Sequence, residues 1–311
     1  MACTGGHLST QQVSAPMSRS RPFSAITALM LCCAVGALCG DACASSPKLV
    51  EFEPAAQPLG SPQERPAHED GQAPKSVAGD RLRGFLAKPD GDGPFPAIVA
   101  LHGCTGLPEA VVQSASERAV SSGYVILLVD SFTTRAIDHT CTPERYALAD
   151  ISTRRLDAYG ALQFLSRQPF VEAHRVAVVG ASQGGMVTLS LVEERSIELF
   201  ANPGKLAFRA AIALYPGCGV VGARPSIPTL VLVGEFDDWT PAHDCVRAIA
   251  HWGSAGAPVD LVTYPRAYHA FDVEILQPGR MMFGHWTEYN PEATEDALRR
   301  MRAFLAAHLQ E

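Results

Sequence analysis

A serine occupies the sharpest turn that the sequence predicts. The segment Gly180-Ala-Ser182-Gln-Gly184 matches the pattern G-x-S-x-G, with a short apolar, β-branched run before it and an apolar, helix-like run after it. This context is typical of a strand that turns at once into a helix. A side chain at Gly180 or Gly184 would collide across the turn, and the helix points its free N–H groups and positive dipole end at the serine. We therefore predict a nucleophile at Ser182, with a Gly-rich phosphate-binding or packing turn as the alternative.

A serine needs a base at neutral pH, and the base needs an acid that holds its tautomer. In an open parallel sheet both partners come from loops at the carboxyl ends of strands. Asp237 and Asp238 follow one apolar strand pattern, and His269 follows the next one. We expect His269 as the base and Asp237, nearer the strand end, as the acid; for Asp238 a cap of the following helix is the competing interpretation. Three other histidines fit surface positions better: His174, His243 and His251.

A tetrahedral oxyanion needs two preorganised N–H donors. The amide of Gln183 is expected to be one of them, because it directly follows the nucleophile. The other is expected from the small-residue loop 102–106, where the amide of Cys104 is our first choice and that of Thr105 the second. His102 in the same loop is interpreted as a turn residue that hydrogen-bonds to the backbone.

Strand and helix patterns alternate from residue 82 onward. Strands are expected at 82–88, 95–101, 124–130, 176–179, 209–215, 228–234 and 259–264, and helices at 108–122, 143–166, 183–195, from Pro241 through His251, and 291–308. The continuous apolar strands are typical of a parallel sheet that is buried on both faces. We predict an α/β fold of residues 79–311, a mostly parallel, doubly wound sheet flanked by helices, with the order Ser, Asp, His of the α/β-hydrolase pattern. A hairpin partner before residue 82 is left open.

One irregular stretch near the end carries many large apolar side chains. Residues 271–290 include Met281, Met282, Phe283, Trp286 and Tyr289. These side chains fit an acyl pocket, a dimer contact or ordinary packing, and the sequence does not choose among them.

The composition excludes some classes of function. The chain has 311 residues, of which 47% are hydrophobic and 18% charged, so it can bury a large core. Its formal net charge of −7, without a run of Lys or Arg, argues against a nucleic-acid or anionic-membrane surface.

The N-terminal region has the pattern of a targeting segment. Arg19 and Arg21 precede the apolar run 26–38, which is short for a membrane span and leads to small residues around Cys43. We expect residues 1–44 to be a signal peptide of a periplasmic or secreted protein without stable membrane insertion after its removal; a buried N-terminal helix is the alternative. The start at Met1 or Met17, and a lipid on Cys43, are left open. Residues 45–78, rich in Pro, Glu, Ala and Gln, are predicted to be a flexible linker.

Cysteine usage agrees with export. Beyond the expected signal region the chain keeps an even set of four: Cys104, Cys141, Cys218 and Cys245. Four cysteines allow three connectivities. The fold favours Cys104 with Cys141, whose loops are expected at one sheet edge, and Cys218 with Cys245; four free thiols are the alternative.

Five motifs in order carry a resemblance to a known family. They are His102-Gly-Cys-Thr-Gly106, Asp130-Ser-Phe-x-x-Arg135, Gly180-Ala-Ser-Gln-Gly-Gly185, Gly234-Glu-Phe-Asp-Asp-Trp-Thr-Pro241 and Tyr268-His-Ala-Phe-Asp272. From about Leu82 to the C-terminus the chain resembles the dienelactone hydrolase family of α/β-hydrolases. The resemblance implies an esterase or lactonase that works through a covalent acyl-enzyme, without metal or cofactor, on a small-molecule substrate.

The chain departs from that family at two positions. The enzymes that give the family its name use cysteine where this chain has Ser182, and they carry a glutamate in the loop that here reads Gly-Cys-Thr-Gly. An ordinary Ser-His-Asp carboxylester hydrolase is therefore the expectation. The family also binds a substrate carboxylate through arginines, for which Arg135 and Arg266 are the candidates here, against a surface or structural ion pair.

Two other functions remain compatible with the sequence. A peptidase or polysaccharide deacetylase can be built on the same scaffold, because one fold hosts many chemistries. A non-catalytic binding protein that kept the fold is the alternative from a different class. The oligomeric state and the natural substrate do not follow from the sequence.

Overall fold

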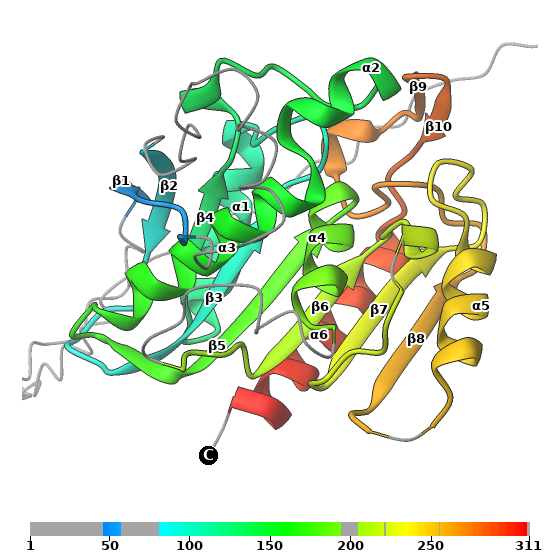
Figure 1. Cartoon of the computed structure of the whole chain (residues 1–311). Helices are drawn as coiled ribbons and strands as arrows, with labels where there is room; N and C mark the ends of the chain where they lie inside the picture. Colours follow the sequence, from blue (N-terminus) through cyan, green and yellow to red (C-terminus); the bar gives the residue numbers. More distant parts are fainter. Residues whose placement is uncertain (1–45, 57–80, 194–204, 221, 255, 310–311) are drawn as a thin grey trace, which may run out of the picture. The chain divides into compact units, whose positions relative to one another are not determined.

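The structure is a computed structural model that describes residues 46–56, 81–193, 205–220, 222–254 and 256–309. The expected signal peptide, residues 1–44, lies outside the described residues, as does most of the expected linker. The described part is built around an eight-stranded sheet in the order β1-β2-β4-β3-β5-β6-β7-β8 (Figure 1). Among the described residues no helix is both long and apolar enough to cross a membrane.

The six strands β4, β3, β5, β6, β7 and β8 run parallel to one another. At one edge of the sheet β2 pairs antiparallel with β4, and β1 pairs antiparallel with β2. The strands are β1 Lys48–Phe52, β2 Leu82–Ala87, β3 Phe95–Leu101, β4 Val125–Asp130, β5 Val171–Ala181, β6 Ala210–Leu214, β7 Thr229–Gly234 and β8 Val259–Tyr264. Every residue of β4, β6 and β7 is buried, which explains their continuous apolar sequences. The predicted α/β fold with a mostly parallel sheet is confirmed.

The first strand corrects the prediction of a linker at residues 45–78. Lys48–Phe52 forms β1 and pairs antiparallel with β2, so the hairpin partner that was left open exists. Phe52 is buried, and its ring lies 5.7 Å from that of Phe164. The segment is therefore ordered by strand pairing and by apolar contacts, since Ala55 is also buried and Val50 packs against the same core.

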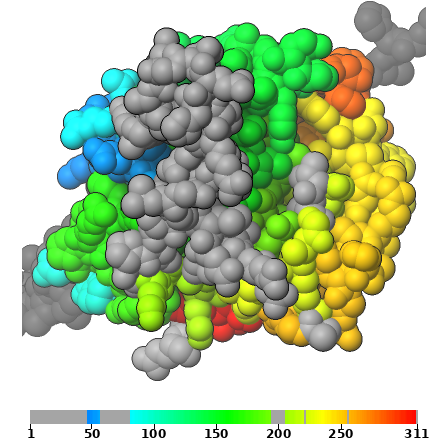
Figure 2. Space-filling view, in the orientation of Figure 1, coloured from blue at the N-terminus to red at the C-terminus, as the bar shows by residue number. Residues whose placement is uncertain are grey.

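Helices cover both faces of the sheet. On one face pack α3 Ile151–Ser166, α4 Gln183–Leu191 and α5 Ala242–Trp252, and on the other pack α1 Glu109–Ser121 and α6 Pro291–Leu309. Alternate residues of β3 serve the two cores: Val99 packs with α3 and α4, whereas Ile98 packs on the opposite side with α1 and α6. The space-filling view shows the residues around α5, in yellow and orange, at the β8 edge of the first face (Figure 2).

The helix predicted at 143–166 is two elements. Pro143–Tyr146 forms α2, a 3-10 turn continues through Ala149, and α3 begins after Asp150. The backbone of Asp150 is extended, and its carboxylate accepts a hydrogen bond from the amide of Thr153. The break therefore comes from an N-cap inside an otherwise helical pattern, because a capping Asp competes with helix continuation.

The sheet order reverses between β3 and β5. The chain proceeds from β3 to β4 on one side and from β5 to β6 on the other. At such a point the loops that leave the adjacent strands diverge and open a crevice at their carboxyl ends. The loop 102–106 and Ser182 both lie at this position. A short separate hairpin, β9 Arg280–Met282 with β10 His285–Thr287, joins the same region through a bridge between Thr287 and His269.

Candidate active site

Ser182 sits in a strained backbone conformation at the end of β5. Its φ of 55° and ψ of −119° are unfavourable for a residue with a side chain. A Cβ at Gly180 would overlap the carbonyl of Gly184, and one at Gly184 would overlap the carbonyl of Leu101 in β3. Both glycines are therefore required, as the sequence predicted, and the second one also allows the elbow to press against the neighbouring strand.

A chain of hydrogen bonds leads from Ser182 through His269 to Asp237. The distance between Ser182 Oγ and His269 Nε2 is 3.0 Å, and His269 Nδ1 lies 2.8 Å from Asp237 Oδ2. Both partner side chains are buried. Because Nδ1 donates its proton to the carboxylate, Nε2 is left unprotonated and faces the serine hydroxyl. This geometry can accept a proton from Ser182.

The carboxylate of Asp237 is held by its own turn. Its Oδ1 accepts hydrogen bonds from the amides of Trp239 and Thr240, at 2.9 and 2.8 Å. The hydroxyl of Thr240 lies 2.9 Å from Oδ2. Asp238 instead points outward, 3.4 Å from a ring nitrogen of His285, and α5 begins after Pro241 without a side-chain cap. The helix-cap interpretation of Asp238 is therefore wrong, and of the two acids only Asp237 contacts His269.

The loop after β3 approaches Ser182 at Gly103. A Cβ placed on Gly103 would lie 3.3 Å from Ser182 Cβ and 3.9 Å from its Oγ. The carbonyl of Gly103 accepts a hydrogen bond from His102 Nδ1 at 2.7 Å. Since a trans peptide is planar, the amide of Cys104 must point away from the His102 ring. Gln183 begins α4, so its amide belongs to the donors that a helix N-terminus leaves without an intrahelical acceptor.

His102 is a buried structural histidine, in agreement with its interpretation as a turn residue. Its Nε2 accepts a hydrogen bond from the amide of Ser131 at 3.2 Å, so the proton must be on Nδ1. Burial, together with the nearby charge of Arg154, holds the pKa of His102 well below its usual value. The ring therefore stays neutral and keeps its hydrogen bond to the carbonyl of Gly103.

Both expected disulfides are present. Cys104 pairs with Cys141 and Cys218 with Cys245, each with a Cα–Cα distance of 4.9 Å. The first bond ties the loop after β3 to the loop after β4, and the amide of Thr140 reinforces it by donating to the carbonyl of Cys104 at 2.8 Å.

Arg135 forms an ion pair inside the protein, which was the alternative to its expected substrate contact. Its guanidinium makes two hydrogen bonds to the buried carboxylate of Asp157, at 2.7 and 2.8 Å, and one to the carbonyl of Ser131. A bidentate pair of this kind is a strong structural contact. Arg266 has an exposed side chain, and its amide hydrogen-bonds to Glu235. The structure thus brings Ser182, Asp237 and His269 together and places Gly103, the residue before Cys104, beside Ser182; neither arginine contacts this group.

Aromatic rings beside His269 were not identified from the sequence as parts of the site. The ring of Trp239 lies 4.9 Å from that of His269 and stacks on His285 at the same separation. Phe283, which is 44% exposed, lies 5.9 Å from Trp239 and 5.0 Å from His139. The side chains of His139, Trp239, Phe283 and His285 come from three segments, namely the loop after β4, the loop after β7 and the β9–β10 hairpin. Only Phe283 had been singled out in the sequence, without a choice between pocket, dimer contact and packing.

On another side of His269, a buried pair of polar side chains supports the ring. The edge of Tyr215 packs on His269 with 4.8 Å between ring centroids. The hydroxyl of Tyr215 donates to Asp272 Oδ1 at 2.7 Å. Burial raises the pKa of both Tyr215 and Asp272. The hydrogen bond satisfies two groups that would otherwise be costly to bury, and it fixes the Tyr215 ring against the imidazole.

Comparisons with known proteins show the family of the chain. The model of the dienelactone hydrolase family matches residues 82–309. A cutinase of Thermobifida alba is 28% identical over 178 residues, which are 57% of this chain and only 53% of the cutinase. A Yersinia pestis protein assigned as a carboxymethylenebutenolidase is 23% identical over 247 residues, 74% of this chain and 85% of that protein.

A solved structure shows the same fold. The dienelactone hydrolase of Anabaena variabilis has a TM-score of 0.56 and 19% sequence identity, and the match covers 85% of this chain and all of that one. The family match extends over all the strands of the sheet except β1 and over each of the motifs that carry the site residues. The chain therefore belongs to the dienelactone hydrolase family of α/β-hydrolases.

Proposed function

We propose that the protein is an exported serine hydrolase that cleaves a carboxylic ester or lactone through an acyl-enzyme intermediate. The observation that carries this proposal is the continuous hydrogen-bond chain Ser182–His269–Asp237, with spacings of 3.0 and 2.8 Å. Its placement next to two amides at the reversal of the sheet order adds support, because a crevice at that edge is where ligands bind in such folds.

Acylation would begin at Ser182. The Oγ atom attacks the ester carbonyl carbon while its proton moves to Nε2 of His269, and the carbonyl π electrons become the oxyanion. Asp237 stabilises the imidazolium that forms. The amides of Gln183 and Cys104 hold the oxyanion by hydrogen bonds. When the intermediate collapses, the alcohol leaves with the proton from Nε2, and the acyl group remains on Ser182.

Deacylation would repeat the sequence with water. Nε2 of His269 takes a proton from the water as its oxygen attacks the acyl carbonyl, and a second oxyanion forms at the same amides. Collapse breaks the bond to Ser182, whose Oγ regains the proton from His269. The carboxylic acid leaves, and the enzyme returns to its starting state.

The proposed substrate is a neutral ester with an apolar group. Arg135, the cation expected to meet a substrate carboxylate, is committed to Asp157. The side chains beside His269 are instead aromatic, and Phe283 and Met281 of the nearby hairpin are 44% and 59% exposed. Exposed apolar side chains next to reactive groups favour apolar substrate parts.

Export is proposed from two features. The pattern of residues 1–44 is that of a signal peptide. The four cysteines of residues 79–311 form two disulfides, which persist in oxidising compartments. Together they favour a periplasmic or secreted enzyme.

The test compares the purified protein with the Ser182→Ala variant on p-nitrophenyl butyrate. We expect kcat/KM to fall by at least about three orders of magnitude in the variant, because the nucleophile and its partners act as a unit. A fluorophosphonate probe should label Ser182 in the parent protein only. If the parent neither hydrolyses the ester nor takes up the probe, the proposal is wrong.

A second pair of substrates tests the proposed charge preference. p-Nitrophenyl butyrate and p-nitrophenyl hemisuccinate have acyl chains of the same length, and only the second carries a carboxylate. We expect the parent enzyme to prefer the neutral ester by about tenfold or more in kcat/KM, since a buried carboxylate without a cation is costly. Equal or better hydrolysis of the hemisuccinate would contradict the neutral-substrate proposal and leave the serine mechanism untouched.

A further inference from the structure

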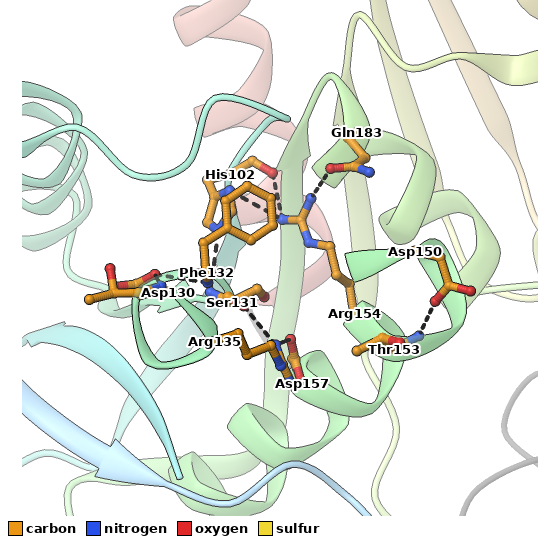
Figure 3. Close-up of polar contacts among 11 residues, drawn as sticks. His102, Asp130, Ser131, Phe132, Arg135, Asp150, Thr153, Arg154, Asp157 and Gln183 are labelled. Carbon is orange, nitrogen blue, oxygen red and sulfur yellow. Dashed lines mark hydrogen bonds and ion pairs between the residues drawn. The ribbon is translucent and has the colours of Figure 1, made fainter. Parts of the chain in front are cut away.

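Arg154 of α3 reaches the two segments that carry the proposed oxyanion donors. Its Nη1 donates to Oε1 of Gln183 at 2.9 Å, and its Nη2 donates to the carbonyl of His102 at 2.6 Å. The residue is 1% exposed. Figure 3 shows the guanidinium between the His102 carbonyl and the side chain of Gln183. One rigid, planar group therefore spans the start of the loop after β3 and the start of α4.

Thr140 in the loop after β4 also joins the loop after β3 to the start of α4. The hydroxyl of Thr140 donates to Oε1 of Gln183 at 2.7 Å, and the amide of Thr140 donates to the carbonyl of Cys104. Oε1 of Gln183 thus accepts from Arg154 and from Thr140. The loop that carries Cys104 is therefore connected to Gln183 through the carbonyl of His102 and through that of Cys104, which restrains the distance between the two donor residues.

Within the described part of the chain no carboxylate forms a hydrogen bond or ion pair with Arg154, although the charge of nearby Asp157 attracts it. Asp157, one turn further along α3, is already taken by Arg135 in a bidentate pair. Nε of Arg154 has no hydrogen-bond partner within the described part of the chain, and one face of the guanidinium lies over the ring of Phe132 at 5.4 Å. Burial lowers the pKa of Arg154 to about 10. The attraction of Asp157 raises this pKa and offsets only part of the cost of burying the cation, because burial is the larger effect.

We propose that Arg154 is a positioning residue of the oxyanion hole. It holds the amides of Gln183 and Cys104 at the spacing that an oxyanion needs, and its positive charge lies behind them. An oxyanion at Ser182 would add a second negative charge on the side of Arg154 away from Asp157's ion pair with Arg135, so the attraction grows as the transition state forms. The inference rests on the proposed function of Ser182, and it adds a residue from α3 that neither touches the substrate nor belongs to the triad.

The experiment uses the full-length protein with Arg154→Met, Arg154→Lys and the matched control Arg155→Met. Arg155 is the next residue of the same helix and hydrogen-bonds to Ser190. On p-nitrophenyl butyrate we expect kcat of Arg154→Met to fall about 100-fold with KM changed less than about threefold. Arg154→Lys should recover part of the loss, because it keeps the charge but cannot bridge both acceptors. The control should stay within about twofold of the parent.

A tetrahedral inhibitor separates positioning from a general structural effect. A phenylboronic acid forms a tetrahedral adduct with a serine nucleophile and places an oxygen in the oxyanion hole. Its inhibition constant should rise in Arg154→Met by about the same factor as kcat falls. Inhibition by butyrate, a ground-state product, should hardly change. Loss of both affinities together, or a fully active and folded Arg154→Met, would overturn the proposal.

A variant that keeps Arg154 covers the case in which Arg154→Met does not fold. Gln183→Met removes one of the two acceptors of Arg154 and retains the backbone amide of residue 183, so it should show the same split between kcat and KM. Unchanged kcat and boronate affinity in folded Gln183→Met would overturn the proposal. An inactive parent enzyme with an unlabelled Ser182 would instead reject the proposed function itself, so the two failures can be told apart.

Discussion

Three glycines leave the space that the backbone around Ser182 needs, and a larger side chain at any of them would contact a neighbouring segment. Gly180 and Gly184 allow the elbow, and Gly103 allows the neighbouring loop to reach Ser182. The first two follow from the sequence, because G-x-S-x-G between a strand and a helix has a known steric meaning. Gly103 could not be assigned in that way, since its constraint comes from a contact between segments that are far apart in the chain. The same is true of Arg154, whose contacts with His102 and Gln183 also join segments that are far apart in the chain.

Gly103→Ala is predicted to impair catalysis more than folding. The new methyl group would lie 3.3 Å from Ser182 Cβ, so the loop or the serine must shift by a few tenths of an ångström. We expect kcat to fall by about tenfold, because catalysis depends steeply on the alignment of the reacting groups. Kinetics with p-nitrophenyl butyrate, beside the melting temperature, would measure both effects.

Gly222→Ala is the matched control for this substitution, because a Cβ at Gly222 meets nothing within 4 Å. It should leave kcat and the melting temperature near those of the parent. A Gly103→Ala enzyme with the parent's kcat would show that the loop has more room than the structure indicates.

At the scale of elements, the buried strands could be predicted from the sequence, whereas the edge strand β1 and the break before α3 could not. Phe95–Leu101 and Val259–Tyr264 agree with the expected bounds, because apolar runs flanked by turn residues define such strands well. β1 was expected as part of a linker, since the segment around it is rich in Pro, Glu, Ala and Gln; its five residues are ordered by pairing with β2 and by the burial of Phe52. The break at Asp150 was also missed, because a cap inside a helical pattern is decided by one side-chain contact.

The elements of the site were easier to predict than its walls. Ser182, Asp237 and His269 each follow a strand, so the parallel sheet alone brings them to one edge. Trp239, Phe283 and His139 come together only through loop conformations that follow no period. The partner of Arg135 could not be predicted for the same reason. Its motif indicated a substrate contact, but in the fold Arg135 forms an ion pair with Asp157, 22 residues further along the chain.

At the scale of the whole molecule, the site and the stability of the fold share a buried group. His102 fixes the loop after β3 only while it is neutral, because its Nε2 must accept from the amide of Ser131. The unfolded chain has no such restriction and takes up a proton near the ordinary pKa of 6.5. Proton uptake by the unfolded state therefore opposes folding at mildly acidic pH, and it acts at the loop that carries one proposed oxyanion donor.

This difference predicts a pH dependence of stability with a definite sign. The pKa of His102 is lowered in the folded state, so its contribution is fully present above about pH 6.5 and is lost as the pH falls toward the folded-state pKa. The loss approaches about 1.4 kcal/mol per pH unit for one proton. Asp272, whose pKa is raised by burial, contributes with the opposite sign, so the total slope of the parent is not diagnostic. The difference between the parent and a His102→Gln variant isolates the histidine.

The measurement is the free energy of unfolding by urea at several pH values from 8 to 5, with the disulfides intact. Above pH 7 the difference between the parent and His102→Gln should be constant, because the histidine is neutral in both states. Below pH 6.5 that difference should shrink steadily, since only the parent loses stability to protonation of residue 102. All other titrating groups are common to the two proteins and cancel. Parallel curves across the whole range would mean that His102 accepts a proton in the folded protein as readily as in the unfolded chain, contrary to its buried hydrogen bonds.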